Sequence, residues 1–198
     1  MLTDTQLQEH EVDFWLNNWN ESWHEFMTKR FHTFYDPFFN FSTLVPPILE
    51  VGCGGTPVSL FFNIEETLID PILDKLTTNS KFATLLRNKQ LISESFLTTN
   101  KLPETHFNSI ICLNCLDHFN NSESTFFELT HKYLKPQGNL YLYYHLRSTE
   151  RDSHLALNQK TIDFSIHKYF NVIKYSKEME PEVIGWADGC QRYILEKQ

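Results

Sequence analysis

Hydrophobic and polar positions change their period along the chain. Residues 4–35 repeat apolar side chains at helical spacing, and Trp15, Trp19 and Trp23 stand four residues apart. This pattern predicts one long helix that ends before Pro37, because a proline disfavours helical backbone at the residue before it. The tryptophan stripe is interpreted as the buried face of that helix, with stacking on the ring of a bound molecule as the alternative.

After residue 47, short apolar runs alternate with helical stretches. Strands are predicted at 48–51, 67–70, 90–93, 109–114, 139–145, 170–175 and 191–196, and helices from Pro57, through about Leu86, from Ser122 to Tyr133 and at 160–168. Such alternation is typical of an α/β protein with a mostly parallel sheet and helices on both faces. The last two strands are far enough apart for an antiparallel hairpin.

Length and composition favour one globular domain over residues 1–198. Hydrophobic residues make up 41% of the chain and 17 are phenylalanine, so much of the core should be aromatic. The net charge of −8 makes nucleic acid a poor candidate partner. The polar N-terminus and the lack of a 20-residue apolar run predict a cytoplasmic protein with no membrane segment.

Cys112 and Cys115 form a C-x-x-C pair inside an apolar run. A strand directs residues three apart to opposite faces, so the two thiols are expected to diverge. Buried, inert cysteines are therefore favoured over a redox or metal site, and no metal is predicted.

A glycine turn follows the first predicted strand, in the segment Pro47–Pro57. Glycines there let a ligand approach the backbone at the carboxyl end of a parallel strand. The dinucleotide fingerprint needs a third glycine where Pro57 stands, and Glu50 beside the turn would repel a pyrophosphate. A ligand with a cationic sulfonium and no phosphate meets neither objection, which favours S-adenosylmethionine over NAD.

Five further short motifs follow this turn along the chain, and the resemblance described below rests on the turn and these motifs together. They are Ile69-Asp70-Pro71, Leu102-Pro103, Phe107-Asn108-Ser109-Ile110, Asn114-Cys115-Leu116-Asp117-His118 and Leu134-Lys135-Pro136-Gln137-Gly138. With the turn, residues 47–144 resemble class I S-adenosylmethionine-dependent methyltransferases of the methyltransferase-11 type. The resemblance implies a Rossmann-like, seven-stranded core over residues 44–198, with residues 1–43 as an N-terminal helical lid.

The resemblance also implies a cofactor site. Its residues would be Glu50, Gly52, Cys53, Gly54, Gly55, Asp70, Pro71, Glu94, Ser95, Phe96, Asn114 and Cys115. The glycines would hold the methionine moiety, with Glu50 ordering the loop, and Asp70 would bind the ribose hydroxyls. Glu94 or Ser95 would face the adenine. Thr56 departs from the usual third glycine, and Ser95 stands where relatives often carry an acid.

Asp117 and His118 are the candidate catalytic residues, at the mouth near the transferred methyl. His118 would be the general base. The alternative is that both residues belong to the start of the next helix, and that alignment alone suffices for methyl transfer. His145 and His154 are pocket-rim candidates, although each is better interpreted as an ordinary surface or rim histidine.

The predicted function is transfer of a methyl group from S-adenosylmethionine to oxygen, nitrogen or carbon of a small molecule, leaving S-adenosylhomocysteine. The alternative is a non-catalytic S-adenosylmethionine-binding protein or sensor. Modification of a protein or tRNA is less favoured, because the chain is acidic and lacks a large inserted domain. The oligomeric state, monomer or homodimer, is left open, as is the acceptor.

Overall fold

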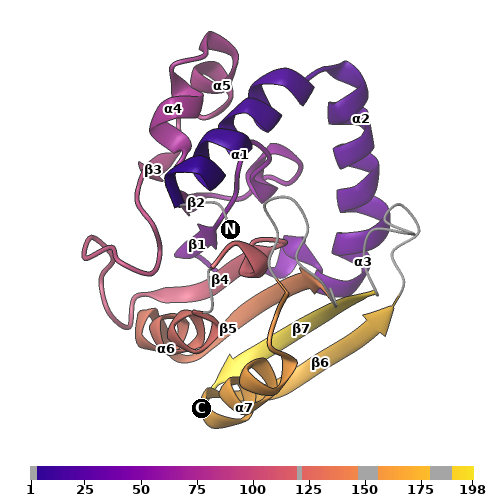
Figure 1. Cartoon of the computed structure of the whole chain (residues 1–198). Helices are drawn as coiled ribbons and strands as arrows, with labels where there is room; N and C mark the ends of the chain where they lie inside the picture. Colours follow the sequence, from indigo (N-terminus) through magenta and orange to yellow (C-terminus); the bar gives the residue numbers. More distant parts are fainter. Residues whose placement is uncertain (1–3, 120–121, 147–155, 179–188) are drawn as a thin grey trace.

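The computed structural model describes residues 4–119, 122–146, 156–178 and 189–198. One seven-stranded sheet runs through them in the order β3-β2-β1-β4-β5-β7-β6 (Figure 1). The strands are β1 (Ile48–Val51), β2 (Glu66–Ile69), β3 (Gln90–Ile92), β4 (Phe107–Leu113), β5 (Leu134–His145), β6 (Phe170–Glu178) and β7 (Cys190–Lys197).

The sheet is mostly parallel, as the alternation predicts. β1 pairs in parallel with β2 and β4, β2 with β3, and β4 with β5. β7 lies between β5 and β6 and is antiparallel to both, so the predicted terminal hairpin is confirmed. The central strands carry runs of apolar, β-branched side chains because they are covered on both faces.

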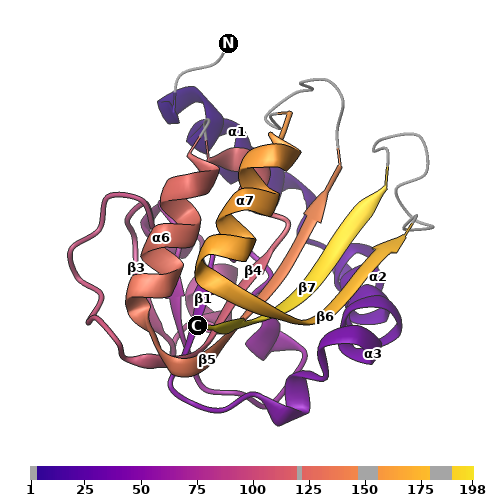
Figure 2. The ribbon, with the colours of Figure 1, turned by 90° about the horizontal axis from the view of Figure 1, so that it is seen from below.

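Two helices cover one face of the sheet. They are α6 (Glu123–Tyr133) and α7 (Gln159–Tyr169), which lie side by side in Figure 2. Phe126 and Ile162 from these helices join Leu140 and Leu142 of β5 in one buried cluster. Apolar residues recur at helical spacing on both helices, which is why each buries one face and leaves the other in solvent.

The N-terminal helices cover the other face. α2 (Glu21–Arg30), a π-helical turn η1 (Phe31–Tyr35) and α3 (Asp36–Phe39) place a phenylalanine-rich cluster on β4 and β5. The sheet residues of that cluster are Ile48 of β1, Ile111 of β4, Tyr141 and Tyr143 of β5, and Cys190 of β7. The expectation of an aromatic core is met there.

The single helix expected over residues 4–35 is wrong, because the chain breaks at Trp19. α1 (Asp4–Asn18) ends there, and the Asn20 side chain caps α2 by accepting a hydrogen bond from the Trp23 backbone N–H at 3.0 Å. The three tryptophans therefore do not form one stripe. Trp19 is buried against Phe82, whereas Trp15 and Trp23 face a cavity described below.

Pro37 does not end the helical path. The η1 turn lets the Asp36 N–H bond to the Phe31 carbonyl, so Pro37 falls in the first turn of α3, where its missing N–H costs nothing. The path ends at Asn40, which has a positive φ of 54°.

The helix expected from Pro57 is also wrong, since only a 3-10 turn, η3 (Val58–Leu60), forms. The chain then leaves the helical path, because Phe61 stacks on Phe31 with ring centroids 4.2 Å apart. The helix expected through Leu86 is two short helices, α4 (Leu73–Thr77) and α5 (Ser80–Leu85). Residues 134–138, which lie between a predicted helix and a predicted strand, form an irregular start of β5.

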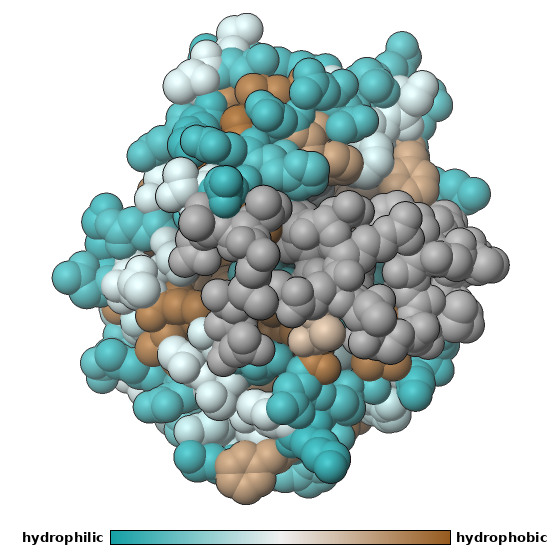
Figure 3. All heavy atoms as spheres, in the orientation of Figure 1, coloured by the Kyte–Doolittle hydropathy of each residue, from teal (hydrophilic) through white to brown (hydrophobic). Residues whose placement is uncertain are grey.

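Hydrophilic residues cover most of the described surface that is visible in the orientation of Figure 1 (Figure 3). No helix within the described ranges is long and apolar enough to cross a membrane.

Candidate functional site

The turn that follows β1 has a backbone conformation that glycine adopts readily because it has no side chain. Gly52 and Gly54 have positive φ values of 67° and 52°. The Gly52 N–H donates to the carbonyl of Ile69 at 2.9 Å, which ties the turn to the end of β2. A Cβ atom at Gly52 would collide with Cys115. The turn is therefore packed between two strand ends.

Asp70, directly after β2, holds this turn from the other side. One carboxylate oxygen accepts the Gly54 N–H at 2.9 Å and the other accepts the Ile72 N–H at 3.0 Å. Asp70 is only 7% exposed, and burial raises the pKa of its carboxyl above the ordinary value although the two N–H donors lower it. Each oxygen keeps a further lone pair.

Two buried glutamates accept hydrogen bonds from backbone N–H groups that follow the turn. Glu50 accepts the Val58 N–H at 2.8 Å, and Glu66 accepts the Ser59 N–H at 3.0 Å. Burial, and for Glu50 the nearby charge of Glu66, raises the pKa of both carboxyls. The backbone donors that would cradle a phosphate are thus already used.

Cys115 folds back onto Cys112, contrary to expectation. Asn114 has a positive φ of 58°, which reverses the chain after β4, so the two sulfur atoms lie 2.6 Å apart. Both cysteines are free and buried, as expected. Burial raises the pKa of the Cys115 thiol well above its ordinary value, and its sulfur faces the Val51 carbonyl at 3.1 Å.

His118 lies between two carboxylates at the end of a 3-10 turn, η4 (Leu116–His118). Its Nε2 is 3.9 Å from Asp117 and its Nδ1 is 4.0 Å from Glu11 of α1. Asp117 is fully buried, so the imidazole is the partner that reaches the cavity. Sequence reasoning did not identify Glu11, which carries no motif.

A cavity of about 510 Å³ joins these residues, a volume typical of small-molecule sites. Of the predicted site residues, it is lined by Glu50, Gly52, Cys53, Gly54, Asp70, Pro71, Asn114, Cys115 and His118. They come from the carboxyl ends of β1, β2 and β4, the edge where open parallel sheets bind ligands. α1 and α2 form the opposite wall.

The other predicted site residues do not line the cavity. Glu94 forms an ion pair with Lys101 at 2.6 Å, and Ser95 accepts a hydrogen bond from its own loop. Phe96 is buried in the cluster under α6, and Gly55 is covered by Trp15 and Phe82. Their assignment to the cofactor stays a prediction.

The far end of the cavity includes His145, a pocket-rim candidate from the sequence, and Arg30, which the sequence did not single out. His145 is only 2% exposed rather than a surface residue, and its Nε2 lies 2.6 Å from the hydroxyl of Tyr143. Arg30 donates to the same hydroxyl at 3.3 Å. The cavity-facing positions of α2 were readable from helical spacing; they are Trp23, Phe26, Met27 and Arg30. His154 lies outside the described residues.

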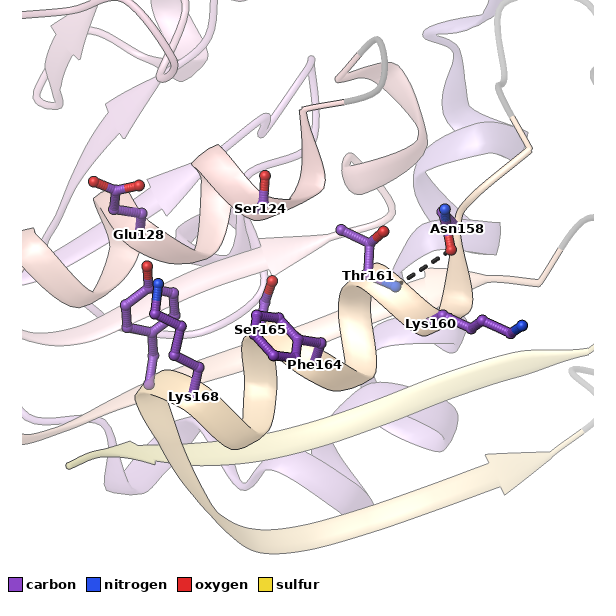
Figure 4. Close-up of a pocket in the computed structure, with 9 residues that line it drawn as sticks. Ser124, Glu128, Asn158, Lys160, Thr161, Phe164, Ser165 and Lys168 are labelled. Atoms are coloured by element: carbon purple, nitrogen blue, oxygen red, sulfur yellow. Dashed lines mark hydrogen bonds between the residues drawn. The ribbon is translucent and has the colours of Figure 1, made fainter.

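A second cavity, of about 470 Å³, is an open groove between α6 and α7 (Figure 4). It is lined mainly by hydroxyl, amide and charged side chains, with Phe164 exposed at its rim. It shares no residue with the first cavity. Among the described residues no group of three or more His, Cys, Asp or Glu side chains is placed to hold a metal ion.

Comparison with known proteins identifies the fold. No family model matches the sequence, and no curated protein sequence matches it. Solved structures do match. A 1,6-didemethyltoxoflavin-N1-methyltransferase from Burkholderia thailandensis, crystallised with S-adenosylhomocysteine, matches with a TM-score of 0.72 and 12% identity over 100% of this chain and 92% of its own.

Two further solved structures are also similar to this chain. The N-methyltransferase NodS from Bradyrhizobium japonicum, also with S-adenosylhomocysteine, matches with a TM-score of 0.66 and 18% identity over 98% of both chains. The [4+2]-cyclase SpnF matches with a TM-score of 0.58 and 15% identity over 76% of this chain and 73% of its own. The chain therefore has the fold of the class I S-adenosylmethionine-dependent methyltransferases.

Proposed function

We propose that this protein is a methyltransferase that transfers the methyl group of S-adenosylmethionine to a small molecule. The observation that carries the proposal is the Asp70–Gly54 hydrogen bond. It places a buried carboxylate beside a glycine turn, at the strand ends where this fold opens into a cavity of about 510 Å³.

The residues present fit the cofactor. Asp70 retains lone pairs for the ribose hydroxyls. The Asn114 amide oxygen is buried at the cavity and has no hydrogen-bond donor among the described residues, so it can accept from the cofactor's amino group. The Glu50 and Asp70 carboxylates suit a cation. When bound, S-adenosylmethionine supplies a methyl group on a positively charged sulfur.

A phosphate-bearing cofactor fits less well. Carboxylates already accept the Val58 and Ser59 N–H groups, and only the three-residue turn η3 follows. The site therefore has neither free backbone donors at that point nor a helix dipole to stabilise a pyrophosphate.

His118 is the residue that would take a proton from the acceptor. Asp117 and Glu11, each about 4 Å away, would stabilise the imidazolium that forms. The aromatic wall from α1 and α2 would exclude water and align the acceptor for in-line attack. If the acceptor atom is already a good nucleophile, alignment alone suffices.

Residues 1–43 would act as a lid over the core. Support comes from Trp15 of α1, which lies directly on Gly54 and Gly55. A cofactor against these glycines must displace that indole ring.

A non-catalytic S-adenosylmethionine-binding protein or sensor is the second candidate. The fold is also shared with a protein described as a [4+2]-cyclase, so the fold by itself does not require methyl transfer. Fold alone does not determine the reaction.

Two measurements test the proposal. Calorimetry should detect binding of S-adenosylmethionine and S-adenosylhomocysteine, and incubation with methyl-labelled S-adenosylmethionine and a metabolite extract should yield S-adenosylhomocysteine and a labelled small molecule. Binding without turnover would favour the sensor. Absence of binding by both compounds would refute both candidates.

A further inference from the structure

Two indole N–H groups on the helical wall of the cavity have no hydrogen-bond acceptor. Nε1 of Trp15, on α1, and Nε1 of Trp23, on α2, are both buried, and neither has a hydrogen-bond partner within the described parts of the chain. Both side chains line the cavity of about 510 Å³. A buried donor without an acceptor costs free energy, and native proteins contain few of them. The two indoles are therefore candidates for contacts with a ligand.

The two donors belong to different parts of the cavity. The Trp15 ring lies on the glycine turn, and Nε1 is among the ring atoms closest to Gly54. That donor is at the proposed cofactor site. Trp23 stands on the next helix, where the Asn20 side chain accepts its backbone N–H at 3.0 Å. Because this cap fixes the backbone, rotation of the side chain alone can turn the Trp23 indole toward a second ligand beside the cofactor.

Aromatic rings surround the Trp23 indole. Its ring centre lies 5.4 Å from that of Phe14, 6.1 Å from that of Trp15 and 5.4 Å from that of Phe26. All four side chains line the cavity. Aromatic rings pack favourably edge to face or offset, so a flat aromatic ligand can make the same kind of contact with this wall.

Cofactor binding is expected to uncover Trp23. A cofactor against Gly54 displaces the Trp15 ring, and this removes one of the rings that pack on Trp23. The Trp23 N–H then gains room to reach a ligand atom. The methyl acceptor is therefore expected to bind after the cofactor.

An aromatic wall also suits a cation, and Glu50 and Asp70 lie in the same cavity. The unpaired donor favours a different ligand. An indole N–H can only donate, so its positive hydrogen attracts a lone pair and repels a cation. A carbonyl oxygen or an unprotonated ring nitrogen would satisfy it.

We propose that the methyl acceptor is a flat aromatic compound with a carbonyl oxygen or ring nitrogen that accepts a hydrogen bond from Nε1 of Trp23. This inference rests on the proposed function, because it places the acceptor beside the cofactor. Trp23 would be a specificity-determining residue, since a compound without such an atom leaves the donor unpaired.

The test uses the full chain saturated with S-adenosylhomocysteine and two pairs of compounds, quinoline against naphthalene and 1-indanone against indane. The members of each pair have similar shapes and differ in the hydrogen-bond-accepting atom. Calorimetry gives their dissociation constants with the original chain and with Trp23→Phe, which keeps a ring without a donor. For at least one pair, we expect Trp23→Phe to weaken the accepting compound relative to its partner by about 5-fold or more.

Trp19→Phe is the matched control. It makes the same replacement at a ring that packs on Phe82 and is not among the residues that line the cavity, so the affinity ratios should not change. Ratios that are the same in Trp23→Phe and the original chain would overturn the inference, as would absence of binding by all four compounds. Tighter binding of N-methylquinolinium than of quinoline would overturn it in favour of a cationic acceptor.

Melting temperature shows whether Trp23→Phe is folded. If it is not, the indole N–H signals of the ¹⁵N-labelled original chain provide the comparison. Quinoline or 1-indanone should move one signal downfield, a signal that persists in Trp15→Phe, whereas naphthalene and indane should not. Absence of such a shift would overturn the inference. Failure of S-adenosylhomocysteine to bind the original chain would instead count against the proposed function.

Discussion

The indole ring of Trp15 lies on Gly54 so closely that a methyl group added to the glycine would be 2.7 Å from three ring atoms. The same ring would meet a methyl group on Gly55 at 2.8 Å. α1 is thus fixed to the turn that the proposed cofactor must contact. Ligand binding and the position of α1 are therefore expected to be coupled.

Trp15 should report cofactor binding. S-adenosylhomocysteine must displace the indole from the glycines, which changes its surroundings and its fluorescence. We expect Trp15→Phe to lose most of the ligand-induced change, whereas Trp19→Phe, which alters a ring packed on Phe82, should keep it. An undiminished signal in Trp15→Phe would refute the lid proposal.

Asp70→Asn should weaken cofactor binding. An amide cannot accept a hydrogen bond at its nitrogen, so both the Gly54 contact and the ribose contact suffer. We expect a loss of about 2–4 kcal/mol in the binding free energy of S-adenosylhomocysteine, measured by calorimetry. Asp74→Asn, at an exposed carboxylate bonded to Ser93, is the control. Equal affinities in both variants would remove the ribose assignment.

His118→Gln should separate catalysis from binding once an acceptor is known. If His118 takes the proton, kcat should fall by about 100-fold or more while cofactor affinity stays within a few-fold. Glu11→Gln, which removes one of the flanking carboxylates, should lower kcat by a smaller factor. A His118→Gln protein that loses thermal stability but keeps its rate per folded molecule would leave alignment as the mechanism.

Ionisation of the buried Glu66 carboxyl should lower the free energy of unfolding as pH rises. Burial raises the pKa of Glu66 above its ordinary value of 4.5, so the folded chain holds this proton to higher pH than the unfolded chain. The free energy of unfolding therefore falls from pH 4.5 upward, until the folded-state pKa is passed.

Glu66→Gln removes that ionisation and should flatten the decline. We expect it to be more stable than the original chain at pH 7.5, and to lose this advantage near pH 4.5. Denaturant melts at both pH values measure the effect, with the exposed Glu65→Gln as the control. An unchanged pH slope in Glu66→Gln would show that the carboxyl does not titrate as described.

The sheet was readable from the sequence because local patterns determine it. Strand-length apolar runs predicted all seven strands, and the glycine turn followed the first of them. Tertiary contacts decided what the sequence did not show. The helix expected from Pro57 gives way where Phe61 stacks on Phe31, a contact between residues 30 positions apart.

Some residues of the candidate site could likewise be predicted from sequence motifs, whereas others are identified only by the structure. Gly54 and Asp70 stand in motifs, and the structure brings them together. Arg30 and His145 stand in none, and their relation depends on how α2 crosses the end of β5. The C-x-x-C expectation failed because alternation along a strand no longer applies once Asn114 adopts a left-handed conformation.

The place of β7 in the sheet has a consequence for how the chain folds. β6 reaches the sheet only through β7, which forms its sole pairing with the other strands described. During synthesis β6 emerges first, yet it must wait for residues 190–197 before it can join the sheet, and until then the edge of β5 is bare. We expect a chain released before residue 190 to aggregate or be degraded rather than form a smaller version of this fold.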